Sequence, residues 1–461
     1  VGGYFVTGKK DQWANFDYFF RKVPDEGGFC IAAGLEQVIE YIENIGFTED
    51  DTAYLETLDI FPADVLEYLR KLRFTGDIYA VPEGTIIFPN EPIIRVAAPL
   101  PEAQLIESAL LNIMNFQTLI ATKSARVCIA AEGDPVIEFG LRRAHGPDAA
   151  LGAARASFIG GAMGTSNLMA GRMLGIPVSG TIAHSWIESF PSELEAFRAY
   201  AKVYPKGCLL LVDTYNTLRS GLPNAIKVGK ELRDTGEGEL IGIRLDSGDL
   251  AYLSTNSRRM LDQNGFEGTK IIASSDLDEW LIESLKKQDA KIDIWGVGTR
   301  LVTSYSCPAL GGVYKLTAIA ENGKMTPKIK RSDNPEKITN PGVKKLVRYY
   351  DESGMMRGDI LFLEDERPDP KKPTRAFHPV FPYIYKTYPA NFEREELSIP
   401  IFINGKRVYD TPPLTKIQEN TKKNLDRLGL EFKRFQNPHV YHVSLSEKLF
   451  RVKQELLMNA Y

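Results

Sequence analysis

One of the five histidines, His184, lies at a predicted strand–helix junction, where catalytic side chains are common. His184 follows Thr181 by three residues, between an apolar run at residues 176–178 and a segment with helical spacing at residues 191–200. This pattern predicts a buried strand that ends near Thr181 and turns toward a helix. A rigid element holds polar groups at such a junction while one side stays open. His184 could act there as a base, an anion stabiliser or a phosphate-accepting nucleophile, although a lone histidine is more often structural or solvated.

Polar residues follow five further apolar runs in the same way. Together with the run at residues 176–178, there are six, which lie at residues 136–139, 176–178, 208–212, 240–245, 271–273 and 292–295. The five further runs lead into Gly140-Leu141-Arg142-Arg143, Asp213-Thr214-Tyr215-Asn216, Arg244-Leu245-Asp246-Ser247-Gly248-Asp249, Ser274-Ser275-Asp276 and Gly296-Val297-Gly298-Thr299. Because the carboxyl ends of parallel strands converge on one face, we expect these segments to line one pocket.

The residue types in these segments suit a phosphorylated sugar. Arg142 and Arg244 can form bidentate bonds with phosphate or carboxylate. Asp246, Asp249 and Asp276 can accept bonds from ribose hydroxyls or hold Mg²⁺ through water.

The segment Gly296-Val297-Gly298-Thr299 offers backbone N–H groups and a hydroxyl ahead of a helix, a usual setting for phosphate. Each segment also has a structural explanation. Arg142 and Arg143 fit a salt-bridged helix start, residues 246–249 fit a helix cap, and a short Gly-x-Gly fits a tight turn. The convergence of all six segments favours a site.

The elements that must position these residues alternate along the chain. From residue 136 each apolar run is followed by a segment with helical spacing, which is typical of a parallel sheet. The runs are almost continuously apolar, which indicates strands buried on both faces. Six such units, with a further strand expected at residues 311–319, predict an irregular (β/α) barrel-like domain. An open doubly wound sheet is the alternative.

The two ends of the chain have a different character. The first part has a strand pattern at residues 16–22, a helix at 32–44, two short strands within 78–88 and a long helix, broken once, at 103–129.

After about residue 325 the pattern fades; residues 364–374 predict an exposed loop and residues 414–457 are mainly helical. We therefore predict an α/β fold with an N-terminal α/β domain at 1–125, a barrel-like catalytic domain at 126–320, and a C-terminal segment at 321–461 that packs partly on the N-terminal domain.

Composition excludes several classes of function. The 461 residues carry a formal net charge of −4, and 25% of them are charged, so bulk charge attracts neither nucleic acid nor a membrane. The sequence has no membrane-spanning apolar run and no leader-like start. The cysteines, Cys30, Cys128, Cys208 and Cys307, are far apart and fit no zinc spacing. This scatter favours a reduced, cytoplasmic protein.

Longer stretches around these residues resemble the nicotinate phosphoribosyltransferase family. The matching stretches are Glu138-Phe-Gly-Leu-Arg-Arg-Ala-His-Gly-Pro-Asp148, Gly180-Thr-Ile-Ala-His-Ser-Trp186, Leu211-Val-Asp-Thr-Tyr-Asn216, Ser220-Gly-Leu-Pro-Asn224, Ile243-Arg-Leu-Asp-Ser-Gly-Asp249, Gly296-Val-Gly-Thr299 and Pro308-Ala-Leu-Gly-Gly-Val-Tyr-Lys315. Phe19-Phe-Arg-Lys22 and Asn334-Pro-Glu-Lys337 also match, so the resemblance runs in order over nearly the whole chain.

The resemblance implies an activity and an architecture. Members join nicotinate to phosphoribosyl pyrophosphate, giving nicotinate mononucleotide and pyrophosphate, in the salvage route to NAD. They couple this step to ATP hydrolysis through a phosphorylated histidine and are formally ligases, with Mg²⁺ (or Mn²⁺) on the phosphates. The implied architecture is a barrel-like domain plus an α/β domain built from both ends of the chain, in a homodimer with active sites at the interface.

Roles carry over to the strand-end residues through the matching motifs. His184 matches the histidine that ATP phosphorylates, and Arg244 and Asp246 complete the implied catalytic group. Thr181 and Arg244 would hold nicotinate, with Arg244 facing its carboxylate, and Phe139 would stack on the pyridine ring.

Ser166 and Asn167 complete the implied base site. They belong to the segment Gly164-Thr-Ser-Asn167, and the related nicotinamide enzyme has a Gly-Thr-Asp-like segment at this place. A neutral serine beside an arginine favours a carboxylate, whereas an aspartate favours an amide donor.

The implied phosphate-binding residues are more widely spread. Arg142, Asp246 and Asp276 would face ribose and metal-bound pyrophosphate; Gly296, Gly298 and Thr299 would cradle the 5′-phosphate; Arg21, Lys330 and Lys337 would reach a phosphate, across the dimer. The family pattern has a Thr-Asp-Leu-Tyr-Gln-like segment, whose tyrosine stacks on nicotinate from the partner subunit, just before the stretch matched by Gly3-Tyr-Phe5. The sequence starts after that point.

Three alternatives remain open at this stage. An enzyme with the same fold could use nicotinamide, against which Ser166 argues. A catalytically silent binding protein could keep the scaffold, against which the presence of His184, Arg244 and Asp246 argues. An unrelated barrel hydrolase would need a paired carboxylic acid and base, and the sequence offers no convincing pair.

Overall fold

The computed structural model describes residues 1–458, and the chain divides into two compact units. Unit 2, here called the barrel unit, spans Ile120–Pro308. Unit 1, the terminal unit, combines Val1–Leu119 with the chain from Ala309 onward. The sequence had placed the boundaries at residues 125/126 and 320/321.

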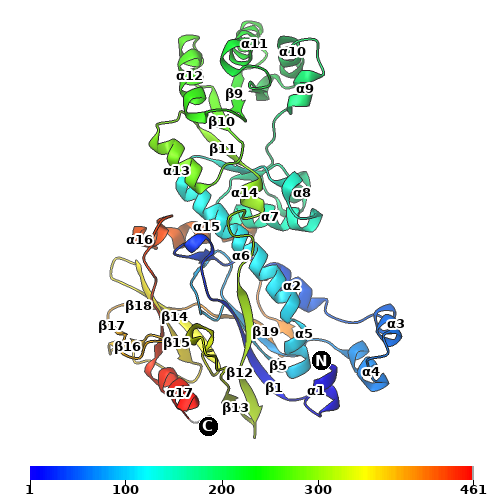
Figure 1. Cartoon of the computed structure of the whole chain (residues 1–461), viewed down its shortest axis with the longest axis vertical. Helices are drawn as coiled ribbons and strands as arrows, with labels where there is room; N and C mark the ends of the chain where they lie inside the picture. The colour runs from blue at the N-terminus through cyan, green and yellow to red at the C-terminus, as the bar shows by residue number, and fades with distance from the viewer. Residues whose placement is uncertain (459–461) are drawn as a thin grey trace. The chain divides into compact units, whose positions relative to one another are not determined.

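The barrel unit is built on one six-stranded sheet in which every neighbouring pair is parallel (Figure 1). In spatial order the strands are β7 (Gly164–Thr165), β6 (Val136–Glu138), β11 (Ile294–Val297), β10 (Lys270–Ala273), β9 (Leu240–Leu245) and β8 (Cys208–Leu211). Ile243, Ile271 and Leu210 are fully buried, as expected of strands covered on both faces. The predicted α/β class and parallel sheet are confirmed.

Helices alternate with these strands, and side-chain caps explain where several of them begin. They are α7 (Pro147–Ile159), α8 (Leu168–Leu174), α9 (His184–Glu188), α10 (Glu193–Val203), α11 (Leu222–Thr235), α12 (Leu250–Gln263), α13 (Glu279–Lys287) and α14 (Thr299–Val302). Ser192, Asp249 and Asp278 cap α10, α12 and α13 by accepting a backbone N–H in the first turn. Shorter helical turns are η2 (Leu141–Arg143), η3 (Pro205–Gly207) and η4 (Thr217–Gly221).

The strand predicted at residues 176–178 was wrong in extent. Only Val178 forms a bridge, to Thr165 of the short strand β7, which the sequence did not predict. Pro177 supplies a carbonyl to the backbone N–H of Thr165 at 3.0 Å but has no N–H of its own, so the ladder stops. A loop therefore leads to Thr181, and His184 begins helix α9 rather than following a strand end.

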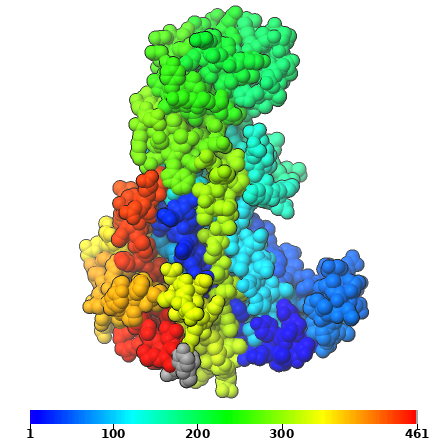
Figure 2. Space-filling model, viewed as in Figure 1, coloured from blue at the N-terminus to red at the C-terminus, as the bar shows by residue number. Residues whose placement is uncertain are grey.

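The terminal unit interleaves the two ends of the chain in one sheet. Its seven strands run in the order β13 (Lys324–Pro327), β12 (Gly312–Glu321), β1 (Trp13–Phe20), β5 (Ile94–Pro99), β3 (Asp77–Ala80), β19 (Ile399–Ile403) and β20 (Lys406–Arg407). The pairs β12–β1 and β19–β3 join segments from opposite ends of the sequence. Figure 2 shows blue N-terminal atoms flanked by yellow-green and red ones. The predicted domain built from both termini is confirmed.

A second sheet of the terminal unit lies wholly in the C-terminal part of the sequence. Its order is β17 (Tyr385–Tyr388), β16 (Thr374–Phe377), β21 (Val443–Ser446), β15 (Met356–Leu363), β14 (Lys344–Tyr350) and β18 (Glu393–Glu396), and a further pair joins β2 (Cys30–Ile31) to β4 (Ile86–Ile87). The sequence analysis did not predict β14, because this strand buries charged residues, which hide its strand pattern. Arg348 and Asp359, both with 0% exposed side chains, pair at 2.6 Å.

The helices expected near the termini are largely present. The predicted break in the helix at 103–129 falls at Ile106, between α5 (Leu100–Leu105) and α6 (Glu107–Ala130). The others are α1 (Gly2–Val6), α2 (Leu35–Glu43), α3 (Glu49–Thr57), α4 (Ala63–Lys71), α15 (Leu414–Asp426), α16 (Leu430–Lys433) and α17 (Glu447–Met458), with turns η1 (Pro24–Glu26) and η5 (Pro335–Lys337). Over residues 1–458, none of the helices has the length and apolar character needed to cross a membrane.

Candidate active site

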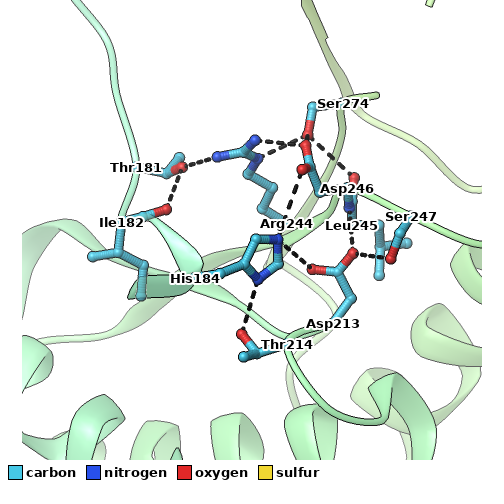
Figure 3. A network of polar contacts seen from close by, with 10 residues as sticks. All are labelled: Thr181, Ile182, His184, Asp213, Thr214, Arg244, Leu245, Asp246, Ser247 and Ser274. Carbon is cyan, nitrogen blue, oxygen red and sulfur yellow. Dashed lines mark hydrogen bonds and ion pairs between the residues drawn. The ribbon is translucent and has the colours of Figure 1, made fainter. Parts of the chain in front are cut away.

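Polar side chains from three adjacent strand ends and one loop meet in the barrel unit. Figure 3 shows the cluster, which comprises Thr181, His184, Asp213, Thr214, Arg244, Asp246, Ser247 and Ser274. Asp213 and Thr214 follow β8, Asp246 and Ser247 follow β9, and Ser274 follows β10. The sheet therefore brings together residues that are far apart in the sequence, as predicted for Thr181, His184, Arg244 and Asp246.

Arg244 is fixed by three hydrogen bonds. Its Nε donates to Ser274 Oγ at 2.8 Å, Nη1 to Thr181 Oγ1 at 2.6 Å and Nη2 to Asp246 Oδ1 at 2.6 Å. Its guanidinium carbon lies 5.8 Å from the centre of the Phe139 ring. A guanidinium held in this way is pre-oriented, so it loses little conformational entropy when it binds an anion.

His184 presents different partners at its two ring nitrogens (Figure 3). Nδ1 lies 3.0 Å from Thr214 Oγ1. Nε2 lies 3.7 Å from Asp246 Oδ2 and 4.0 Å from Asp213 Oδ1. Because both carboxylates can only accept, the Nε2 edge favours a proton there, and the lone pair is then on Nδ1. The side chain is 39% exposed, so the ring remains accessible.

Asp213 is a buried carboxylate with one satisfied oxygen. Its Oδ2 accepts from the backbone N–H of Asp246 at 2.9 Å and from Ser247 Oγ at 2.6 Å. Its Oδ1 is buried and has no hydrogen-bond partner, and the side chain is only 2% exposed. A buried unpaired oxygen is costly and calls for a cationic or donor partner, which His184 supplies when Nε2 carries a proton.

Asp246 is kept ionised by its neighbours. Burial alone would raise the pKa of its carboxyl, but a hydrogen bond from Ser274, the Arg244 guanidinium and the nearby His184 together lower it. An ionised Asp246 holds the Arg244 fork and faces the His184 ring at the same time. The carboxylate is one-quarter exposed, so it can also reach a ligand.

A second buried carboxyl joins the segments that follow β6 and β7. Glu138 accepts from the backbone N–H of Gly140 and from the Thr165 hydroxyl, the latter at 2.5 Å. Its main-chain carbonyl also accepts the N–H of Ser166 at 2.9 Å. Burial raises the pKa of Glu138, although these hydrogen bonds oppose the rise. This arrangement fixes the backbone on both sides of Phe139 and next to Ser166.

Gly296 makes room for the Phe139 ring. A Cβ on Gly296 would lie 2.6 Å from Phe139 Cδ2, a distance that packed atoms do not reach. Gly298 precedes α14, which begins at Thr299 as the sequence predicted. Any side chain at Gly296 would therefore displace Phe139.

Other predicted site residues lie outside this cluster, and their roles remain predictions. Arg142, in η2, and Asp276, after β10, are exposed at the ends of their strands. Asn167 directs its side-chain oxygen to the N–H groups of Met169 and Ala170 and so caps α8. Asp249 caps α12, which bears out the structural explanation for this end of residues 246–249. Arg21 belongs to the terminal unit, where it lines a cavity of about 700 Å³.

Four residues of the cluster, Asp213, Thr214, Ser247 and Ser274, were not assigned roles from the sequence. The segment containing Asp213 and Thr214 was recognised as a strand end, and so was that containing Ser274. Their contacts with His184 and Arg244 depend on which strands are neighbours, and the order β10-β9-β8 is a property of the sheet. The polar residue directly after each buried run was the signal available.

The fold and the site together define the class of protein. A pre-oriented arginine and a histidine between carboxylates, at the carboxyl ends of parallel strands, are typical of an α/β enzyme that handles an anionic small molecule.

Comparison with known proteins identifies the family. Profiles described as the nicotinate phosphoribosyltransferase N-terminal domain, family and C-terminal domain match residues 2–115, 135–353 and 343–453. The chain is 51% identical to nicotinate phosphoribosyltransferase of Bacillus subtilis (98% of this chain, 92% of that protein) and 40% identical to one from Mycobacterium tuberculosis (97% and 91%). The crystal structure of human nicotinic acid phosphoribosyltransferase matches with a TM-score of 0.87 and 29% identity, covering 98% of this chain and 97% of that one. The chain belongs to the nicotinate phosphoribosyltransferase family.

Proposed function

We propose that this protein joins nicotinate to phosphoribosyl pyrophosphate and couples the reaction to ATP hydrolysis. In the synthetic step the ribose C1–oxygen bond to pyrophosphate breaks and a C1–nitrogen bond to nicotinate forms, giving nicotinate mononucleotide. The observation that carries the proposal is the Arg244 fork, which Thr181, Ser274 and Asp246 hold next to His184. The relatives named above support the same reaction.

Arg244 and Phe139 would bind the nicotinate. The fixed guanidinium matches a carboxylate in shape and charge, and the ring of Phe139, 5.8 Å from it, offers a stacking face. Thr181 and Ser166 are neutral, so they add no repulsion toward the carboxylate. Positioning and charge stabilisation account for most of the acceleration expected of such a displacement.

His184 would carry the phosphoryl group from ATP. Its Nδ1 lone pair attacks the γ-phosphorus, a nitrogen–phosphorus bond forms, and the bond between that phosphorus and ADP breaks. Asp213 and Asp246 stabilise the positive charge that the ring gains. The added phosphoryl group would order the pyrophosphate site and thereby favour synthesis. Water would then cleave the nitrogen–phosphorus bond, releasing phosphate and restoring His184, which completes the hydrolysis of ATP.

Mg²⁺ (or Mn²⁺) would enter with the phosphates. In residues 1–458 no three side chains of the metal-binding types gather closely enough to hold an ion by themselves. Mg²⁺ commonly uses one or two carboxylates together with substrate phosphates, which fits Asp246 and the unpaired Oδ1 of Asp213. When bound, the ion neutralises charge on the pyrophosphate. Asp276 would face the ribose.

We further propose a cytoplasmic homodimer with shared active sites. Leu168, Met169 and Met173 on α8 are 74%, 61% and 61% exposed, beside Ser166 and Asn167. An apolar surface of this kind favours a protein interface. A mixture of His184→Ala and Arg21→Ala chains should regain activity that each homodimer lacks if the subunits exchange and share sites; mixtures no more active than their components would contradict sharing.

The reaction is tested by mononucleotide formation from phosphoribosyl pyrophosphate with nicotinate or nicotinamide, each with and without ATP. Product from nicotinate, raised by ATP in the parent but not in His184→Ala, supports the proposal. Preference for nicotinamide would retain the fold and overturn the argument from Ser166. Failure to form product from either base would favour a catalytically silent binding protein.

A further inference from the structure

We infer that Thr214 is a positioning residue, which holds the His184 ring by donating a hydrogen bond to Nδ1, the nitrogen that the two carboxylates at Nε2 leave without a proton. This inference rests on the proposed role of His184 as phosphoryl carrier. It gives a task to a hydroxyl that neither the sequence motifs nor the proposed reaction assign.

The geometry singles out this hydroxyl. Thr214 Oγ1 lies 3.0 Å from His184 Nδ1, within ordinary hydrogen-bond distance. On the opposite edge of the ring, the carboxylate oxygens of Asp246 and Asp213 are 3.7 and 4.0 Å from Nε2, too far for a strong hydrogen bond. Of the contacts that the His184 ring makes with Thr214, Asp246 and Asp213, the one with Thr214 is therefore the shortest.

The chemistry of the partners decides the direction of the bond. A carboxylate only accepts, whereas a threonine hydroxyl can donate. A proton on Nδ1 would leave the Nε2 lone pair facing two anionic groups, which is repulsive. With the proton on Nε2, both carboxylates face an N–H and the Thr214 hydroxyl donates to Nδ1. Of the two neutral tautomers, only the second suits all three partners of His184.

Thr214 is itself held in place by the end of β8. The preceding residue, Asp213, is tied to the segment after β9 through the Asp246 N–H and Ser247. Two residues later, Asn216 accepts the N–H of Arg219 at 2.9 Å and starts the next turn. The side chain of threonine is branched at Cβ, which restricts its rotamers further. The backbone and the rotamer of Thr214 are thus restrained, so its hydroxyl can orient the His184 ring.

Phosphoryl transfer changes the partner of this hydroxyl. When Nδ1 bonds to phosphorus its lone pair is consumed, so Thr214 can no longer donate to it. The same hydroxyl is then beside the phosphoryl oxygens and can donate to one of them. Thr214 would therefore orient the ring before transfer and hold the product of transfer afterwards.

The test combines two measurements on Thr214→Val, Thr214→Ala and Thr214→Ser. The first is the rate at which ³²P from [γ-³²P]ATP labels His184. We expect about tenfold loss in the valine and alanine variants, since the hydrogen bond that orients the ring is removed. Serine should restore labelling to near the parent rate. Thr235→Val, on α11, is the matched control and should label like the parent, because its hydroxyl donates to Leu232 O of the same helix.

The second measurement is the ¹⁵N NMR spectrum of the His184 ring without ATP. In the neutral form of the ring, the parent and Thr214→Ser should carry the proton on Nε2 and show the Nδ1 chemical shift of a nitrogen that accepts a hydrogen bond. Thr214→Val should keep this tautomer, which the two carboxylates set, and lose the hydrogen-bond shift at Nδ1. A parent ring protonated on Nδ1, or undiminished labelling of folded Thr214→Val and Thr214→Ala, would overturn the inference. Absence of label on His184 in the parent would instead refute the proposed function, while the NMR result still tests Thr214.

Discussion

Asp213 Oδ1 lies 4.0 Å from His184 Nε2, is buried, and has no hydrogen-bond partner. The other oxygen of the same carboxylate is bonded to the backbone of Asp246 and to Ser247. The carboxylate is therefore anchored on one side and directed at the histidine on the other. This arrangement suits a group that stabilises positive charge on the ring during phosphoryl transfer.

Asp213→Asn should lower the ATP-stimulated rate by about tenfold to a hundredfold, because the amide keeps the shape of the carboxylate but not its charge. Initial rates of mononucleotide synthesis with and without ATP measure this effect. Asp234→Asn, an exposed change on α11, serves as the control. A rate equal to that of the parent would show that Asp213 has only a structural role.

Ser274→Ala should raise the pKa of Asp246, because the hydrogen bond from Ser274 is the largest of the effects that lower it. The folded pKa lies below the unfolded value of 3.8, so this carboxylate stabilises the fold fully above pH 3.8 and loses that contribution as pH falls through the folded pKa. In Ser274→Ala this contribution is smaller, and its loss is complete at a higher pH. A ¹³C NMR titration of Asp246 in the parent, in Ser274→Ala and in the surface control Ser189→Ala checks the shift. Equal titration in all three would contradict it.

Ser166→Asp should change the preferred base. An aspartate close to the bound carboxylate repels nicotinate and can accept the amide N–H of nicotinamide. We expect kcat/KM for nicotinate to fall by about a hundredfold, while that for nicotinamide rises or is retained. Competition between the two bases measures the ratio, with Ser179→Asp, an exposed change in the loop before Thr181, as the control. An unchanged ratio would exclude Ser166 as the residue that distinguishes acid from amide.

Lys453 should make stability depend on pH in the alkaline range. Its side chain is buried, its Nζ donates to Asn340 Oδ1 and Pro379 O at 2.8 Å each, and burial with the nearby Lys344 lowers its pKa to about 8. Above pH 8 the folded protein releases this proton, whereas the unfolded chain keeps it up to its usual 10.5. The free energy of unfolding therefore gains roughly 3 kcal/mol from this group between pH 8 and 10.5.

The comparison of the parent with Lys453→Met isolates that contribution. Urea unfolding at several pH values should give the parent an upward slope that the variant lacks. Parallel curves for the two proteins would mean that Lys453 keeps an ordinary pKa in the folded state.

The sequence was most informative where local pattern and burial coincide. Buried apolar strands such as β9 and β10 were predicted with nearly correct bounds, and the arginine and aspartate on and after β9 were identified as site residues. It was misleading at residues 176–178, because Pro177 has the apolar character of a strand residue but cannot donate to a ladder. It was silent on β14, whose buried Lys344 is neutralised by Asp17 from the N-terminal part of the chain and whose Arg348 is neutralised by Asp359 on the neighbouring strand β15.

In the candidate site, too, some features could be predicted from the sequence and others could not. His184, Thr181 and Arg244 could be named because their segments match long family motifs. The contacts of Thr214 and Ser274 could not, because they arise from the lateral order of β8, β9 and β10. Neighbouring polar residues along a strand end are visible in a sequence, whereas partners across strands become visible only in the folded sheet.

The most direct test of the central claim is to locate the phosphoryl group after incubation with [γ-³²P]ATP. We expect acid-labile, base-stable label on the peptide that contains His184, and no such label in His184→Ala. Label on any other residue, or equal labelling of His184→Ala, would contradict it.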